Sequence, residues 1–144
     1  DGRYDMLPNE LPQGVTAVHE EHPQDHIVDC SPGTCYLIMT HHHGVDMALT
    51  EAVVKRNDAG YLGVIGSVTK GRKFKQRLAA KKVPQQQIEQ LNCPMGKAGI
   101  QGKQPMEVAI AIAAQVMHLY QSLATEGEVK LDKYVHTMEI EEHV

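Results

Sequence analysis

Two short apolar runs, residues 36–39 and 61–65, are bounded by polar or turn-forming residues. Both runs are continuous rather than alternating, which is typical of strands buried in a parallel sheet. Residues 15–18 form another short apolar stretch and are a third strand candidate. Residues 27–30 fit either the end of a strand or a helical turn, and the pattern does not decide between them.

Helical periodicity predicts helices between and after these strands. One helix follows the histidines at 41–43 and ends at the Asn-Asp-Ala-Gly turn of residues 57–60. A second follows residues 61–65, a short one covers residues 85–91, and a long one begins at Pro105. The residues expected to face the core are Val45, Leu49, Ala52, Val53, Phe74, Leu78, Ala109, Ile112, Ala113, Val116, Tyr120 and Leu123.

This alternation of strands and helices predicts an α/β fold, with a mostly parallel Rossmann-like sheet and flanking helices. We assign residues 1–126 to this domain and residues 127–144 to a C-terminal extension, which is either an added strand or a mobile tail. Ligands of such folds bind at the carboxyl ends of the strands. The histidines and the Gly66-Ser67 turn each directly follow a predicted strand, so we expect both at that edge.

Composition narrows the class of protein. The chain has 144 residues, a hydrophobic fraction of 42%, one Phe and no Trp, so the core must be largely aliphatic. The net charge of −4 argues against a nucleic-acid binder, and no apolar run approaches the ~20 residues of a membrane span. The polar first residues do not form a signal peptide. The odd number of cysteines, Cys30, Cys35 and Cys93, favours reduced thiols and a cytoplasmic protein.

Positive charge is concentrated in one predicted helix. Residues 70–82 hold seven of the fourteen Lys and Arg residues and no acid, which leaves a net charge of −11 on the remainder of the chain. Such a helix faces an anionic ligand or partner, the acidic surface of the protein itself, or simply solvent.

Two glycine-containing loops suggest phosphate binding. Gly66, Ser67 and Lys70 form a G-S-x-x-K turn at a helix start, where backbone N–H groups and the helix dipole attract anions. Gly96, Gly102 and Lys103 belong to a second loop before the long helix. Neither loop is a Walker motif. The alternatives are a plain strand-to-helix turn for the first and a flexible connection for the second.

The three consecutive histidines have several interpretations. In an extended chain, His41 and His43 point to the same side and could share a ligand, while His42 faces away. They could line a ligand pocket, cap the following helix, or bind a metal. A metal would need further donors, and His19, His22, His26, Asp46 and Cys93 lack diagnostic spacing.

An ordered set of motifs resembles a known family. T-H-H-H at 40–43, Y-L-G-V-I-G-S-x-x-K at 61–70, C-P-M-G at 93–96 and G-K-x-P-x-E-V-A at 102–109 are similar to the C-terminal Rossmann-type domain of the XdhC/CoxI family. These are accessory proteins of xanthine dehydrogenase and related molybdenum hydroxylases. The resemblance covers roughly residues 36–123.

The resemblance implies a chaperone of the molybdenum cofactor (molybdopterin), not an enzyme. Such proteins hold the cofactor while a cysteine desulfurase supplies sulfur, and then deliver it to the apo-molybdenum hydroxylase. The phosphate and metal centre of the cofactor would suit this set of candidate cofactor-binding residues: His41, His43, Gly66, Ser67, Lys70, Arg72, Cys93, Gly96, Gly102 and Lys103. Whether Cys93 carries sulfur or is an inert thiol is open.

The chain departs from the family pattern in three places. His42 stands where Asp is common, and Gln104 stands where Thr would cap a helix. Family domains begin with a strand, a glycine turn, a helix and a second strand, and Asp1-Gly2-Arg3 resembles the residues just after that second strand, so we expect this first portion to be absent from the sequence. We therefore expect an incomplete sheet at the N-terminus, with strands supplied by another chain or segment or rearranged, and a homodimer formed through the sheet edge.

Three other functions remain as alternatives. A nucleotide-dependent Rossmann-type oxidoreductase would need a glycine fingerprint after the first strand, which this chain lacks. A zinc-dependent hydrolase could use the histidines. An interaction module could dock an acidic partner on the basic helix.

Overall fold

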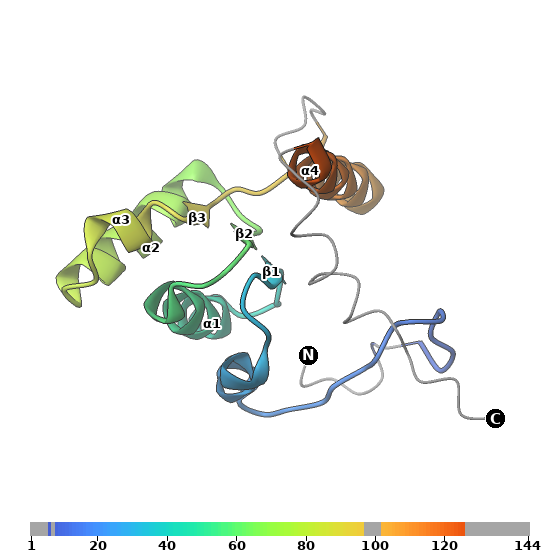
Figure 1. The fold of residues 1–144 in the computed structure, drawn as a ribbon, viewed down its shortest axis with the longest axis horizontal. Helices are drawn as coiled ribbons and strands as arrows, with labels where there is room; N and C mark the ends of the chain where they lie inside the picture. The colour runs from blue at the N-terminus through green and yellow to red at the C-terminus, as the bar shows by residue number, and fades with distance from the viewer. Residues whose placement is uncertain (1–5, 7, 97–101, 126–144) are drawn as a thin grey trace.

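The computed structural model describes residue 6, residues 8–96 and residues 102–125 (Figure 1). The elements, in chain order, are the 3₁₀ helix η2 (Pro23–Asp29), β1 (Cys35–Ile38), α1 (His43–Arg56), β2 (Tyr61–Val64), α2 (Val68–Ala80), α3 (Gln85–Ile88), β3 (Leu91–Asn92) and α4 (Pro105–Thr125).

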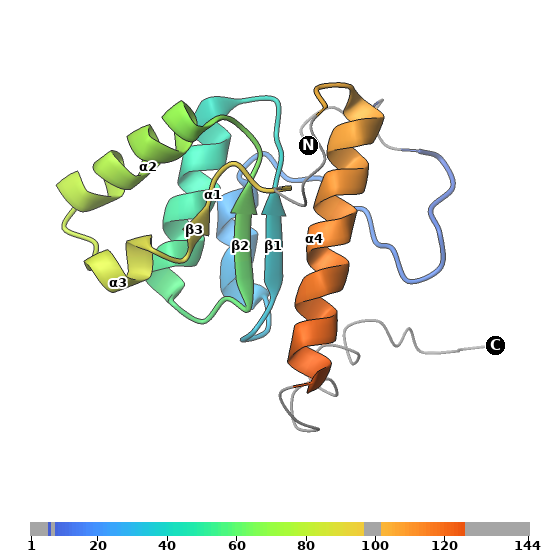
Figure 2. The ribbon, with the colours of Figure 1, turned by 90° about the horizontal axis from the view of Figure 1, so that it is seen from above.

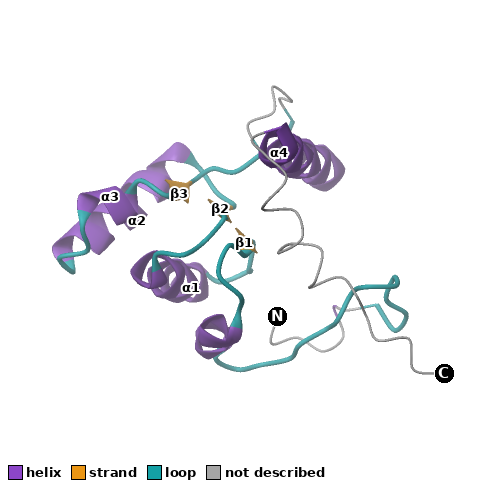
Figure 3. Cartoon of the chain, in the orientation of Figure 1, coloured by secondary structure: helices purple, strands orange, loops and turns teal. Residues whose placement is uncertain are grey.

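The strands form an open parallel sheet in the order β1-β2-β3, which confirms the predicted α/β class (Figures 2 and 3). Cys35 pairs with Tyr61 and Ile38 with Val64, so β1 and β2 are in register along their whole length. β3 joins β2 through Leu62 and Leu91. Within the described residues, β1 has β2 as its one neighbour, and its other edge is open.

One face of the sheet forms the core. Tyr36 and Ile38 of β1 and Leu62 and Val64 of β2 alternate onto this face, where α1 and η2 cover them (Figure 1). α2 and α3 lie beside β3, and α2 is anchored by Phe74 and Leu78 as predicted. The other buried members of this core cluster are Ile27, Met47, Leu49, Val53, Val54, Val83, Ile88 and Leu91.

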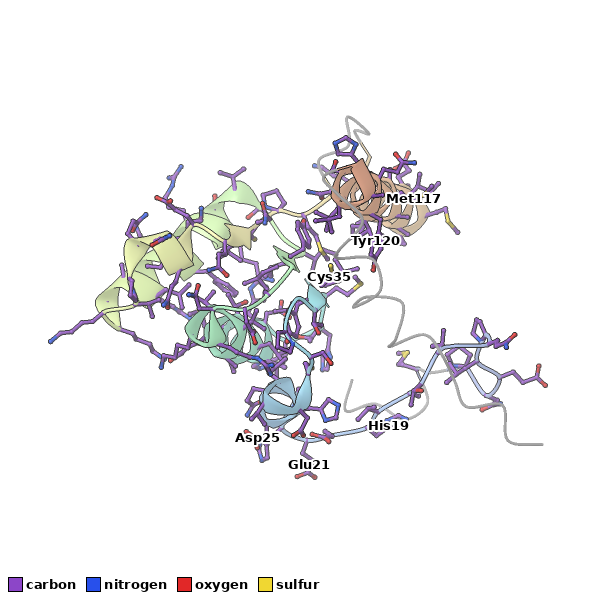
Figure 4. The ribbon with its side chains drawn as sticks, in the orientation of Figure 1. His19, Glu21, Asp25, Cys35, Met117 and Tyr120 are labelled. Atoms are coloured by element: carbon purple, nitrogen blue, oxygen red, sulfur yellow. The ribbon has the colours of Figure 1, made fainter. Side chains whose placement is uncertain are left out.

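The opposite face is less completely covered. α4 lies on this side, toward the β1 edge, and Cys35 is on the side of β1 that faces Tyr120 (Figures 2 and 4). At Gly63 a Cβ atom would lie 2.7 Å from Cε1 of Tyr61 and 3.0 Å from the Met95 side chain, so the missing side chain makes room for both. Leu37 of β1 remains 38% exposed.

Several sequence predictions need correction. Residues 15–18 are not a strand. They are exposed and have no regular structure, because no described strand lies beside them to pair with their backbone. The ambiguous stretch 27–30 belongs mainly to η2. The helix predicted over 85–91 ends at Ile88, and Leu91 begins β3 instead.

The buried face of α4 differs in part from the predicted one. Ala111 and Ile112 are buried, whereas Ala109 and Ala113 are exposed, and Val116, Tyr120 and Leu123 are half-buried. The helix is apolar on several sides, so packing of Ala111 and Ile112 against Gly96, not periodicity, selects the buried face. Residues 127–144, predicted as an extension, lie outside the described residues.

Candidate functional site

The loops that follow β1 and β2 are joined by a buried ion pair. Lys70 Nζ donates to Asp46 Oδ2 at 2.5 Å and to the Ile65 carbonyl at 2.7 Å. Asp46 Oδ1 accepts from the Thr40 backbone N–H at 3.0 Å and from the Thr40 hydroxyl at 2.6 Å. The two charged side chains are 9% and 2% exposed. Satisfied in this way, the pair fixes the two loops relative to one another.

Gly66 and Ser67 have local structural roles in the same arrangement. Gly66 has φ +152°, and a Cβ there would lie 2.4 Å from Cδ of Lys70, so glycine lets the lysine stem cross the turn. Ser67 caps α2 by accepting a hydrogen bond from the Lys70 N–H at 3.1 Å. The sequence predicts Lys70 as a phosphate ligand, yet its ammonium group is bonded to Asp46 and Ile65. The signal for this partner was Asp46 itself, an acid in the first turn of a helix at the same sheet edge.

The three histidines separate into different environments. His42 is the N-cap of α1, and its Nδ1 accepts from the N–H groups of Gly44 at 3.1 Å and Val45 at 3.4 Å. His41 lines a hollow of about 410 Å³ with Glu20, Glu21, Pro23, Thr40, His42, Val45 and Leu49. His43 lines a different hollow. The helix begins at His43, so the extended alternation that would place His41 and His43 on one side ends there.

The hollow beside His43 has a basic rim. It measures about 290 Å³ and lies between the first residue of α1 and one flank of α2. Its lining comprises His43, Ser67, Thr69, Lys70, Lys73, Phe74 and Arg77. Lys73 and Arg77 are exposed, and neither forms an ion pair with any residue in the described part of the chain. Neither residue belongs to the candidate set that the family resemblance implies, although their i, i+4 spacing places them on one helix flank.

A second hollow lies on the other flank of α2. It measures about 430 Å³, and Arg72, Lys75 and Cys93 are among its lining residues. The Cys93 thiol is 3.8 Å from the Ser67 carbonyl oxygen. A Cβ at Gly71 would lie 2.4 Å from the Cys93 carbonyl oxygen, so α2 packs directly on this loop. Arg72 and Cys93 therefore border the same hollow, whereas Lys73 and Arg77 border the hollow beside His43.

The second glycine loop has a structural explanation where it is described. Gly96 has φ +81°, and its N–H donates to Gln115 Oε1 of α4 at 2.5 Å. Gly102 leaves room for the Glu107 carboxylate, which accepts from the Gln104 N–H at 3.0 Å and so caps α4. Lys103 is exposed. Gly102 and Lys103 do not line the hollows beside His41 or His43.

Burial and neighbouring side chains shift the pKa values of three groups away from their ordinary values. Burial raises the pKa of Tyr36 to about 12, assisted by the neighbouring Cys30. Its hydroxyl has no hydrogen bond of good geometry to any described residue. Burial also raises the pKa of the Cys35 thiol. Hydrogen bonds from Lys55 and Lys81 lower the pKa of Glu51 and tie α1 to the end of α2.

Metal binding has no support in the described part of the chain. No group of three His, Cys, Asp or Glu side chains there could hold a metal ion. This finding leaves the zinc-dependent hydrolase without a site among those residues. No helix in the part of the chain that the structure describes is long and apolar enough to cross a membrane.

The open parallel sheet, with Gly-Ser and histidine loops at its carboxyl edge, defines a Rossmann-type α/β domain. A family model described as the XdhC Rossmann domain matches residues 6–116, and the chain belongs to this family. None of the curated proteins compared with the chain matches it.

Proposed function

We propose that this chain binds the molybdenum cofactor, as an accessory protein that supports cofactor sulfuration and its insertion into a xanthine dehydrogenase-type molybdenum hydroxylase. Membership of the XdhC family makes an accessory role the first expectation. The observation that carries the proposal is the basic hollow at the carboxyl edge of the sheet, held in shape by the Asp46–Lys70 pair. Rossmann-type domains bind their ligands at this edge.

The side chains that line the hollow suit the phosphate group of the cofactor. Molybdopterin ends in a phosphate, and His43, Ser67, Lys73 and Arg77 offer hydrogen-bond donors and positive charge to such a group. Gly66 supports the site by letting Lys70 reach Asp46. The other candidates, His41, Arg72, Cys93, Gly96, Gly102 and Lys103, lie outside this hollow, and their contact with the cofactor stays a prediction.

Cofactor retention tests the proposal. The 144-residue chain is mixed anaerobically with molybdenum cofactor released from a molybdenum enzyme and passed over a gel-filtration column. We expect molybdenum and pterin fluorescence to elute with the protein, and delivery to an apo-hydroxylase to restore its activity. Elution of all the molybdenum and pterin in the small-molecule fraction would overturn the proposal. A parallel NADH titration checks the oxidoreductase alternative, for which fluorescence enhancement and shift are expected.

Partner binding is part of the same proposal. A cysteine desulfurase and the apo-hydroxylase would each have to contact the cofactor-bound protein. We also propose that β1 pairs with a second copy through the edge at which no other described strand lies, because backbone groups at such an edge can extend the sheet. Light scattering that shows a monomer at all concentrations, with cooperative unfolding, contradicts this dimer.

A further inference from the structure

Positive charge on α2 is compensated very unevenly. Lys70 is paired with Asp46, and Lys81 just beyond the helix is paired with Glu51. Arg72, Lys73, Lys75 and Arg77 form no ion pair with any residue between 8 and 96 or between 102 and 125. The helix itself contains no acid. Uncompensated cations cost free energy through mutual repulsion, which a bound anion relieves.

These four cations divide between the two flanks of the helix. Lys73 and Arg77 border the hollow that also contains His43, whereas Arg72 and Lys75 border the hollow that contains Cys93. The two environments differ in chemistry. The first adds an imidazole and the hydroxyls of Ser67 and Thr69, while the second adds the amides of Gln76 and Gln85 and the apolar side chains of Val68, Ala79 and Ile88. The first flank therefore combines its two cations with an ionisable imidazole and two hydroxyls, whereas the second combines its cations with neutral amides and apolar groups.

The geometry points to a phosphate-binding site in this first hollow, formed by Lys73 and Arg77 of α2 and His43 of α1. Side chains at i and i+4 of a helix are neighbours, so one phosphate can contact both cations. The Arg77 guanidinium matches two phosphate oxygens, and Lys73 adds a compact charge. The Ser67 oxygen accepts from Lys70 N–H, which leaves its hydroxyl proton to donate to the ligand.

Lys70 has a different role in this site. It lines the hollow, but its ammonium is bonded to Asp46 and lies 5.3 Å from the centre of the buried Phe74 ring. The charge of Lys70 is thereby balanced within the protein. Lys70 positions the wall of the hollow, and the phosphate is held by the two cations one and two turns further along the helix.

The identity of the complete ligand rests on the proposed function, but the phosphate chemistry does not. Binding is measured by titrating inorganic phosphate and phenyl phosphate into the 144-residue chain, followed by calorimetry and by backbone amide NMR shifts. The test variant is Lys73→Gln/Arg77→Gln. The matched control is Lys75→Gln/Lys82→Gln, which removes the same charge from residues that do not line this hollow. Circular dichroism and thermal unfolding confirm that both variants are folded.

We expect the test variant to bind phosphate at least about tenfold more weakly, since it loses two charge-assisted contacts, and the control to change by less than about threefold. Arg77→Lys keeps the charge but loses the guanidinium that can bind two phosphate oxygens. Its affinity for phosphate should therefore lie between those of the two double variants. Amide shifts should centre on His43, Ser67 and Thr69. Equal losses in both double variants would show attraction to the overall charge of the helix and overturn the site.

The same variants separate this inference from the proposed function. One outcome is that the wild-type chain retains no molybdenum cofactor but its phosphate binding still depends on Lys73 and Arg77. This result would support the phosphate-binding site and contradict the proposed function. If the test variant retains the cofactor as well as wild type does and binds phosphate unchanged, the function stands and the site falls.

Discussion

Lys70 Nζ lies 2.5 Å from Asp46 Oδ2, although the two residues are 24 positions apart in the chain. The bond joins the first turn of α1 to the first turn of α2, and both side chains are almost fully buried. Because Lys70 also donates to the Ile65 carbonyl, the contact involves the end of β2 as well. At the carboxyl edge of the sheet, the starts of α1 and α2 and the loops that lead into them are therefore connected by one hydrogen-bonded network.

Removing the cation should destabilise the protein strongly. Lys70→Met keeps much of the lysine volume but leaves the Asp46 carboxylate buried without its cation, at a cost of about 3–5 kcal/mol. Urea unfolding measures the loss, and Lys73→Met is the control, because Lys73 is exposed on the same helix. A loss below about 1 kcal/mol for Lys70→Met would contradict a buried, stabilising pair.

Substitutions of His42, the N-cap of α1, should either lower or raise the stability of the protein, depending on the new side chain. His42 Nδ1 accepts from two backbone N–H groups, so His42→Ala should lower the free energy of unfolding by about 1 kcal/mol. His42→Asp should raise it by about 0.5 kcal/mol, because a carboxylate both caps the helix and interacts favourably with its dipole. Chemical denaturation at pH 7 should give the stability order Asp, His, Ala. An Asp variant less stable than the Ala variant would show that His42 is not acting as a cap.

Acid should weaken the link between α1 and α2. The pKa of Glu51 is lowered from 4.5 by hydrogen bonds from Lys55 and Lys81. A depressed carboxyl pKa stabilises the folded state above the unfolded value, and this stabilisation disappears as the pH falls through the folded value. The stability difference between wild type and Glu51→Gln should thus be constant near neutral pH and shrink below about pH 4.5. Thermal unfolding between pH 3 and 7 checks this, and a difference independent of pH would exclude the charge effect.

At high pH, deprotonation of Tyr36 should destabilise the folded protein. Its pKa is raised to about 12 by burial, so the folded state binds its proton more tightly than the unfolded state does. The resulting stabilisation is complete below the unfolded pKa of 10.0 and is lost as the pH rises through about 12. Tyr36→Phe should make unfolding less sensitive to pH above 10. Subtracting the absorbance titration of this variant from that of wild type isolates Tyr36, and a midpoint near 10 would contradict its burial.

The sequence correctly predicts elements and core residues where the local hydrophobic pattern coincides with burial in the fold. The apolar runs located β1 and β2 to within a residue, and Phe74 and Leu78 were correctly assigned to the core because amphipathic spacing identifies one face. Asn57 ends α1 in the left-handed conformation expected for this turn. The family resemblance, confirmed by the XdhC Rossmann domain match, rests on the order of several short motifs.

The features that escaped prediction depend on tertiary contacts. β3 has two residues, too few for a periodic signal, and forms only because Leu91 reaches the edge of β2. The separation of His41 from His43 depends on where α1 begins. The partner of Lys70 lies in a different helix, so the motif G-S-x-x-K alone could not distinguish a ligand-binding lysine from a structural one.

The position of α2 between two hollows allows two ligands to bind at once. Lys73 and Arg77 border one hollow, while Arg72 and Cys93 border the other. A small ligand in the first hollow and a protein docked against the second would lie on different sides of the helix. Under the proposed function, the cofactor could then stay bound in the first hollow while a partner protein docks against the second.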